Sequence, residues 1–143
     1  MIQIRLALKN DLDSVRKIYR KTLDKHRFIS TDSHQQSIEH KKIWVVYDDE
    51  DLVKGYIKVI INGYDIKISE LAIFPEEQNK GYGTTMVRFL VDKFPKKSLW
   101  VETNTANKFY ENLGFVKTGI KTTKTKKTLS IYRLQRGGLF ENI

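Results

Sequence analysis

Apolar and polar residues alternate over residues 2–6, which is the period of a strand with one buried face. The period changes over residues 12–23, where apolar side chains recur every three or four positions and so share one face of a helix. Asn10 or Asp11 stands where a side chain can cap the start of that helix. The pattern therefore predicts that the chain begins with a strand followed by an amphipathic helix.

The strand period and the helix period also predict the elements in the rest of the chain. Polar residues 25–37 are expected to form a loop and a short second helix, and turn signals follow at Asp48-Asp49-Glu50-Asp51 and at Asn62-Gly63. Further strands are predicted over residues 42–47, 52–61, 66–74, 98–102, 115–119 and 129–134, and further helices over residues 84–93 and 106–113. This order predicts a mixed sheet that is antiparallel at first and has βαβ character later.

A glycine-containing loop, Gln78-Asn79-Lys80-Gly81-Tyr82-Gly83, separates a strand-like run from a helix-like run. Two glycines around one residue allow a positive φ and leave no Cβ to block a ligand. At the start of a helix, exposed N–H groups and the helix dipole favour an anion. The loop lacks the Walker A pattern, and Met86 stands where a dinucleotide-binding fingerprint needs its third glycine. Taken alone, the loop fits either a phosphate site or a tight connection between strand and helix.

Length and composition indicate an ordinary globular protein. The chain has 143 residues, of which 40% are hydrophobic and 30% charged, enough for one domain with a core of its own. No apolar stretch approaches the length that spans a bilayer, and the first ten residues lack the apolar centre of a signal peptide. A cytoplasmic protein is therefore expected.

The chain contains no cysteine, which excludes disulfides, thiolate metal sites and a cysteine nucleophile. Its three histidines, His26, His34 and His40, lie in one region without the close spacing of metal ligands. We interpret them as surface or loop residues, and the sequence predicts no metal site.

The formal net charge is +9, and the densest basic run spans residues 121–127, between two strand-like segments. Such charge attracts anions, whether cofactor phosphates, an acidic substrate or nucleic acid. The alternative is a solvated hairpin end, which we favour because the run has no interleaved aromatic residues.

Two segments resemble one family. Residues 78–83 match the Gln/Arg-x-x-Gly-x-Gly/Ala loop of the GNAT superfamily of N-acetyltransferases, and Leu71, Ile73 and Pro75 stand where its central strand carries Leu-x-Val-x-Pro. Downstream, Ala106-Asn107-Lys108-Phe109-Tyr110-Glu111-Asn112-Leu113-Gly114-Phe115 is similar to the family's Ala-x-x-x-Tyr-x-x-x-Gly-Phe segment. The resemblance implies a GNAT-like α/β (α+β) fold, a mixed, mostly antiparallel sheet of about seven strands flanked by about four helices. Residues 1–136 would form this single acetyltransferase domain, and residues 137–143 a C-terminal tail.

The resemblance also implies acetyl-CoA as co-substrate. Backbone groups at the end of the central strand would pair with the pantetheine arm like an added strand, and the loop would hold the pyrophosphate, mostly through main-chain N–H groups. Where the family often carries an asparagine, this chain has Thr103, with Asn104 beside it. The implied cofactor contacts are Leu71, Ala72, Ile73, Gln78, Asn79, Lys80, Gly81, Tyr82, Gly83, Thr84, Asn104 and Asn107.

Acetyl transfer to an amine requires a group that removes a proton from the amine and a group that neutralises the departing thiolate. Tyr110 aligns with the family's tyrosine near the cofactor sulfur and is the candidate acid; the alternative is a half-buried helix aromatic. Glu70, at the start of the central strand, is the candidate base, acting directly or through water. Its alternative role is a carboxylate that faces solvent or pairs with a lysine. Without cysteine, direct transfer is the favoured mechanism.

Three functions remain open at this point. The leading hypothesis is an acetyl-CoA-dependent N-acetyltransferase that acts on a primary amine of a small molecule or protein. The alternatives are a non-catalytic acyl-CoA-binding module and a basic nucleic-acid-associated protein, of which the last lacks any recognised binding motif. No membrane partner is expected, nucleic acid is the less favoured partner, and a homodimer is an open alternative.

Overall fold

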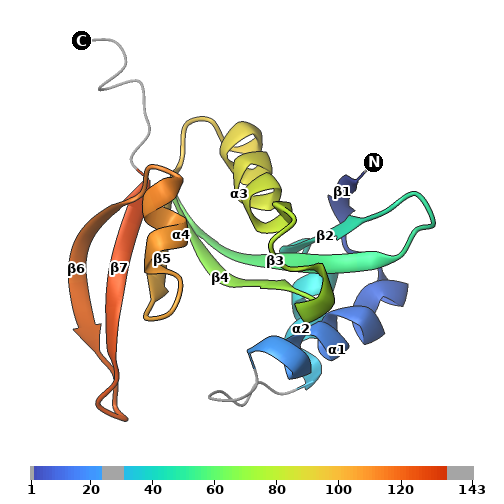
Figure 1. Cartoon of the computed structure of the whole chain (residues 1–143), viewed down its shortest axis with the longest axis horizontal. Coiled ribbons are helices and arrows are strands. Elements are labelled where there is room, and N and C mark those ends of the chain that lie inside the picture. Colours follow the sequence, from blue (N-terminus) through green and yellow to red (C-terminus); the bar gives the residue numbers. More distant parts are fainter. Residues whose placement is uncertain (1, 24–30, 135–143) are drawn as a thin grey trace. The chain divides into compact units, whose positions relative to one another are not determined.

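The alternating segments form a seven-stranded sheet with the strand order β1-β2-β3-β4-β5-β7-β6 (Figure 1). The computed structural model describes residues 2–23 and 31–134. Strands β4 and β5 run parallel, whereas the ladders β1–β2, β2–β3, β5–β7 and β6–β7 are antiparallel. The predicted mixed, mostly antiparallel sheet with four α-helices is therefore confirmed over the described residues.

The strands are β1 (Gln3–Leu6), β2 (Ile43–Tyr47), β3 (Val53–Asn62), β4 (Asp65–Ile73), β5 (Ser98–Thr103), β6 (Val116–Thr122) and β7 (Thr128–Leu134). The helices are α1 (Leu12–Thr22), α2 (Thr31–Glu39), α3 (Tyr82–Lys93) and α4 (Asn107–Asn112), and the 3₁₀ turns are η1 (Lys9–Asp11) and η2 (Pro75–Glu77). Each predicted element is present, and its ends lie within three residues of those predicted. The predicted tail, residues 137–143, lies outside the described residues.

The chain divides into two compact units. The first unit comprises Met1–Val59 and Glu70–Leu90, and the second comprises Ile60–Ser69 and Val91–Ile143. Strands β3 and β4 and helix α3 therefore each contribute residues to both units.

The first unit has a core on one face of its strands. Val15 and Ile18 of α1 and Ile38 of α2 pack in one buried cluster with inward residues of β2, β3 and β4. On the opposite face of β2, the Trp44 ring lies 6.2 Å from that of Phe89 in α3. Helices α1 and α2 thus cover one face of these strands, and α3 covers the other.

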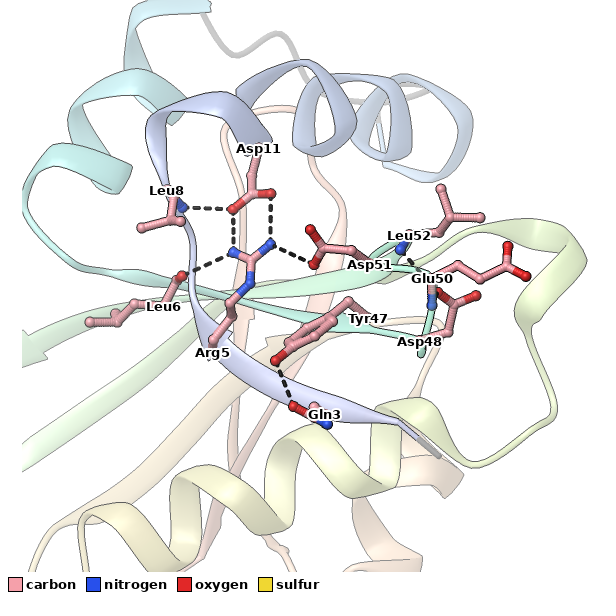
Figure 2. Close-up of polar contacts among 10 residues, drawn as sticks. All are labelled: Gln3, Arg5, Leu6, Leu8, Asp11, Tyr47, Asp48, Glu50, Asp51 and Leu52. Carbon is pink, nitrogen blue, oxygen red and sulfur yellow. Dashed lines mark hydrogen bonds and ion pairs between the residues drawn. The ribbon is translucent and has the colours of Figure 1, made fainter.

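Within the first unit, a polar network joins β1 to the start of α1 (Figure 2). Asp11 accepts two hydrogen bonds from Arg5, at 2.6 and 3.2 Å, and one from the Leu8 backbone N–H at 2.7 Å. Asp11 stands at the N-cap position of α1 but makes no capping bond, so the predicted capping role of its side chain is wrong. Its carboxylate instead accepts hydrogen bonds from the charged Arg5 of β1 and from the Leu8 backbone N–H at the start of η1.

The second unit is built on the antiparallel strands β5, β7 and β6. Alternate residues of β5 are buried, and α4 follows β5. Gly114 comes just after the C-cap residue of α4, and its φ of +92° is typical of that position. The predicted hairpin end is confirmed, since Thr123 and Lys127 close an exposed turn between β6 and β7 with a 2.8 Å backbone hydrogen bond.

Candidate active site

Strand β4 carries a carboxylate on its buried face. Burial alternates along the strand, so that Ile66, Ile68, Glu70 and Ala72 are all buried, and Glu70 is only 3% exposed. Glu70 lies inside β4 rather than at its start, and the alternative that it faces solvent is wrong. A carboxylate in such a position must be compensated by hydrogen-bond donors or positive charge.

Three residues of the first unit supply that compensation. The Oε1 atom of Glu70 lies 2.9 Å from Nε2 of His34 and accepts a 2.6 Å hydrogen bond from the Tyr56 hydroxyl. The Nζ atom of Lys58 lies 3.5 Å from the other carboxylate oxygen, Oε2. Oε2 itself is buried, and none of the described residues makes a hydrogen bond to it. One oxygen is therefore occupied, whereas the other keeps its capacity to accept a hydrogen bond.

The environment of Glu70 favours its charged form. Burial alone would raise the pKa of Glu70, but the hydrogen bonds from His34 and Tyr56 and the charge of Lys58 outweigh it. The pKa of Glu70 consequently lies below its ordinary value, and the group is a carboxylate at neutral pH. It is a weaker base than a free glutamate, but it attracts a positively charged amine.

His34 was not recognised from the sequence as part of this cluster. Its side chain is 2% exposed, and its ring meets those of Tyr19 and Tyr56 edge to face, at centroid distances of 5.0 and 5.9 Å. The interpretation of His34 as a surface or loop residue is therefore wrong, whereas His40 is exposed and His26 lies outside the described residues. The spacing of His34 and Ile38, one helical turn apart, was the signal that they share the inner face of α2.

The glycine loop has the backbone that was expected, at slightly different residues. Gly81 has a φ of +84° and Asn79 a φ of +67°, while Gly83 already belongs to α3. A Cβ atom at Gly81 would have no neighbour within 4 Å, so the space beside this residue is open. Two hydrogen bonds tie the loop to the elements on either side: Gln78 donates to the Ile73 carbonyl of β4 at 3.0 Å, and Thr85 of α3 donates to the Gly81 carbonyl at 2.9 Å. The loop is thus shaped by these bonds and exposed on its outer side.

Lys80 is the positive side chain of this loop, and it is already paired. Its Nζ atom lies 3.0 Å from Glu77, which also pairs with Lys54 at 3.1 Å. Lys54 lies in turn 3.4 Å from Asp48. Because the charge of Lys80 is already balanced, the groups of this loop that are available to an anion are mainly its main-chain N–H groups.

The end of β4 lies beyond its ladder with β5. That ladder joins Asp65, Ile66 and Lys67 to Ser98, Leu99 and Trp100. Residues 71–73, which were predicted to pair with the pantetheine arm, follow four residues later on the same strand. Their position is consistent with an edge at which an extended ligand can add.

Tyr110 is the predicted acid, and it belongs to the second unit. It is 4% exposed, and its ring contacts those of Phe109 and Phe115 edge to face, at 4.9 and 5.2 Å. Burial raises the pKa of Tyr110, so its hydroxyl remains protonated over the physiological range. Among residues 2–23 and 31–134, no hydrogen-bond partner of that hydroxyl is found. The ring is held firmly, and the hydroxyl is a neutral donor.

The two predicted asparagines differ. Asn104 is exposed, whereas Asn107, in α4, donates to Ser130 at 3.3 Å and has a buried Oδ1 atom to which no described residue hydrogen-bonds. Thr103, which replaces the family's frequent asparagine, accepts hydrogen bonds from the backbone N–H groups of Thr105 and Ala106 and so shapes the start of α4. Of these residues, Asn107 is the one with an unused acceptor.

The structure therefore brings the predicted site residues together in two groups. The first unit contains Glu70, the end of β4 and the glycine loop, and the second contains Tyr110, Asn104 and Asn107. The residues that the sequence did not indicate are His34, Tyr56 and Lys58, which surround Glu70.

Comparison with known proteins decides the family. A model of the acetyltransferase (GNAT) domain matches residues 39–117, more than half of the chain. The chain belongs to the GNAT family. An uncharacterized N-acetyltransferase in the lysA 3′ region of Bacillus methanolicus is 25% identical over 83 residues, which are 58% of this chain and 69% of the relative. The GNAT resemblance and the enzyme hypothesis are thus confirmed: the chain is a GNAT N-acetyltransferase.

Solved structures agree on the fold. The ribosomal-protein-S18-alanine N-acetyltransferase of Escherichia coli superposes with a TM-score of 0.82 over 100% of this GNAT chain and 99% of its own, at 18% identity. N-acetylglutamate synthase of Neisseria gonorrhoeae, solved with coenzyme A and N-acetyl-glutamate, gives a TM-score of 0.79 at 17% identity, over 95% of this chain and 36% of its own. Homologues with this fold therefore bind coenzyme A. Among the described residues, no helix is long and apolar enough to cross a membrane.

Proposed function

We propose that this GNAT protein transfers the acetyl group of acetyl-CoA directly to a primary amine of a small molecule or a protein. The observation that carries this proposal is the ionised, buried Glu70 carboxylate on the strand that leads into the glycine loop, since its Oε2 atom accepts no hydrogen bond from the described residues and lies 3.5 Å from the Lys58 ammonium. Acetyl-CoA, when bound, supplies the acetyl group as a thioester.

Several features of the chain fit that co-substrate. The open space at Gly81 and the positive φ values of the loop leave room for a pyrophosphate against main-chain N–H groups. Backbone groups of residues 71–73 would pair with the amide groups of the pantetheine arm as an added strand does. In the second unit, Asn107 has an Oδ1 acceptor to which no described residue hydrogen-bonds, and such an acceptor suits an amide N–H of the cofactor.

Glu70 would act on the acceptor amine through Oε2. His34 and Tyr56 occupy Oε1 and fix the carboxylate, so Oε2 is the oxygen that receives a proton, directly or through a water molecule. Because the pKa of Glu70 is lowered, direct removal of a proton from an ammonium group is uphill. The carboxylate therefore also serves to attract and orient the amine, and the three side chains around it are positioning residues.

Tyr110 would act on the departing sulfur. Its hydroxyl is protonated over the physiological pH range, since burial raises its pKa. A neutral phenol held by two aromatic rings donates a hydrogen bond to a developing thiolate without reorganisation of the site. Its role is thus hydrogen-bond donation to the developing thiolate; because burial makes this phenol a weaker acid than a free tyrosine, it keeps its proton, and the thiolate is protonated from solvent after it departs.

The first test is calorimetric titration with acetyl-CoA. The native protein is expected to bind, and the Gly83→Trp variant is expected not to bind, because its indole fills the space at the start of α3. A matched control is Lys93→Trp, which places the same side chain at an exposed position near the end of the helix. Failure of the native protein to bind acetyl-CoA, or equal binding by the Gly83→Trp variant, would contradict the assigned cofactor site.

The second test is a screen of amines for release of free thiol from acetyl-CoA. With an accepted amine, Glu70→Gln is expected to lower kcat by about 10² to 10⁴, the usual contribution of a positioned proton acceptor. Glu76→Gln is the control, because Glu76 is an exposed carboxylate in η2. An unchanged pH–rate profile in Glu70→Gln would remove Glu70 from the mechanism while leaving cofactor binding intact.

A further inference from the structure

The last strand of the sheet order, β6, has a free edge. It pairs with β7 on one side, and within residues 2–23 and 31–134 no strand pairs with its other side. All of its residues except Gly119 are exposed, including two large apolar side chains, Val116 at 65% and Ile120 at 62%. A row of unpaired N–H and C=O groups beside such side chains is a template for another strand.

The hairpin that presents this edge is basic throughout. Residues 116–134 contain five lysines and one arginine and no aspartate or glutamate. Lys121 pairs with Glu102 and Arg133 with Asp65, both on neighbouring strands. For the remaining lysines, 117, 124, 126 and 127, the described part of the chain supplies no carboxylate within ion-pair distance. The edge is thus surrounded by positive charge that this protein does not balance locally.

The unpaired edge of β6 and the lysines around it together favour a partner strand of negative charge. Lysines on an edge strand oppose pairing with a neutral aggregating strand or with a second, equally basic copy of the hairpin. The same lysines attract a strand that carries carboxylates at alternate positions. Nucleic acid is less suited, because the one aromatic residue of the hairpin, Tyr132, is 1% exposed and offers no surface on which a base could stack.

We propose that the outer edge of β6 binds an extended acidic peptide segment of a protein partner, which adds to the sheet as a further antiparallel or parallel strand. Main-chain hydrogen bonds supply affinity, and the unbalanced lysines supply the preference for Asp and Glu. This docking edge is separate from the residues assigned to acetyl transfer, and binding there does not require acetyl-CoA.

The test is fluorescence anisotropy with a labelled ten-residue peptide of alternating Glu and Val, in the absence of acetyl-CoA. Binding is expected to weaken with added salt and to weaken about tenfold or more in the double variant Lys117→Glu/Lys124→Glu. The matched control is Lys93→Glu/Lys96→Glu, which changes the net charge equally at two exposed lysines outside the hairpin. Circular dichroism spectra verify that both variants are folded.

Two further probes separate strand pairing from general attraction. The same peptide with alternate amides N-methylated keeps its charge but loses hydrogen bonds along one edge, and it is expected to bind about tenfold more weakly. Equal binding of the methylated peptide, or equal weakening in both charge variants, would overturn the proposal. So would tighter binding of a single-stranded oligonucleotide of the same net charge, or no binding of the acidic peptide at all, in which case the lysines only protect the edge.

Discussion

The two units of this GNAT protein handle charge in opposite ways. The described residues of the first unit contain twelve Lys and Arg against eleven Asp and Glu, whereas those of the second contain eleven against four. In the first unit, a buried carboxylate, Glu70, is enclosed by donors from α2 and β3. In the second, the excess of lysines lies on exposed positions of the β6–β7 hairpin. The first unit thus buries a compensated carboxylate, whereas the second exposes an excess of positive charge.

The largest expected difference concerns stability. Glu70→Ala leaves the Lys58 ammonium, which is 12% exposed, without its buried partner, and we expect a loss of about 3–5 kcal/mol in the free energy of unfolding. Glu102→Ala in the second unit should cost about 1 kcal/mol, because its partners Lys67 and Lys121 are exposed enough to regain water.

Urea denaturation followed by circular dichroism measures both losses. The comparison requires that the slope of the unfolding free energy against urea stays the same in the variants. Equal losses for the two glutamates would mean that the ion pairs around Glu70 contribute no more to the free energy of unfolding than the more exposed pairs of Glu102.

The next largest effect concerns the turnover of the variant that removes the proposed acid, Tyr110. Tyr110→Phe should lower kcat by about 10- to 100-fold, as expected for one lost hydrogen bond to developing charge. Its ring contacts with Phe109 and Phe115 remain, so the KM for acetyl-CoA should hardly change. Phe109→Leu is the control, since it changes the aromatic packing but keeps the hydroxyl. Equal turnover by Tyr110→Phe would remove the hydroxyl from the mechanism.

The sequence was sufficient for what is local in the chain. Strands and helices follow from the period of apolar residues, and the glycine loop follows from its own six residues, so both could be predicted. The surroundings of Glu70 could not, because His34 and Tyr56 are 36 and 14 residues away along the chain. Their hydrogen bonds exist only once α2 has packed against β3 and β4.

Asp11 shows that tertiary packing can override a local rule even for a partner only six residues away. Its position satisfies the local rule for a helix cap, but its carboxylate binds Arg5 of β1 instead. The local rule correctly gives the N-cap residue of α1. Which donors bind the Asp11 carboxylate is decided by how β1 packs beside the helix start. The fold was therefore predictable in outline, and the electrostatics of the site were not.

A smaller effect separates Glu70 from Glu102 by pH and salt. The pKa of Glu70 is lowered although burial acts to raise it, because His34, Tyr56 and Lys58 favour the charged form, and that of Glu102 is lowered against the same effect by Lys67 and Lys121. Each therefore adds stability above the ordinary glutamate pKa of about 4.3, and that stability is lost as pH falls through the folded-state pKa. Added salt should reduce the contribution of Glu102 more than that of Glu70, since Lys121 is 57% exposed.

Unfolding of the native protein, Glu70→Gln and Glu102→Gln between pH 3 and 6, at low and high salt, measures this difference. The gap between native protein and Glu70→Gln should close toward low pH and be nearly independent of salt. A gap that widens toward low pH would show that Glu70 is protonated in the folded protein and would contradict its assignment as a carboxylate.

The smallest effect concerns the loop itself. Lys80→Ala should weaken acetyl-CoA binding only about twofold, because Lys80 is exposed and already shares Glu77 with Lys54. Glu77→Ala should instead strengthen binding slightly, since it frees both lysines for the phosphates. Calorimetric titration of the two variants at low and physiological salt measures the effects, with Lys93→Ala as an exposed control at the end of α3. A loss of tenfold or more in Lys80→Ala would mean that side-chain charge, and not the main-chain N–H groups at the start of α3, dominates phosphate binding in the first unit.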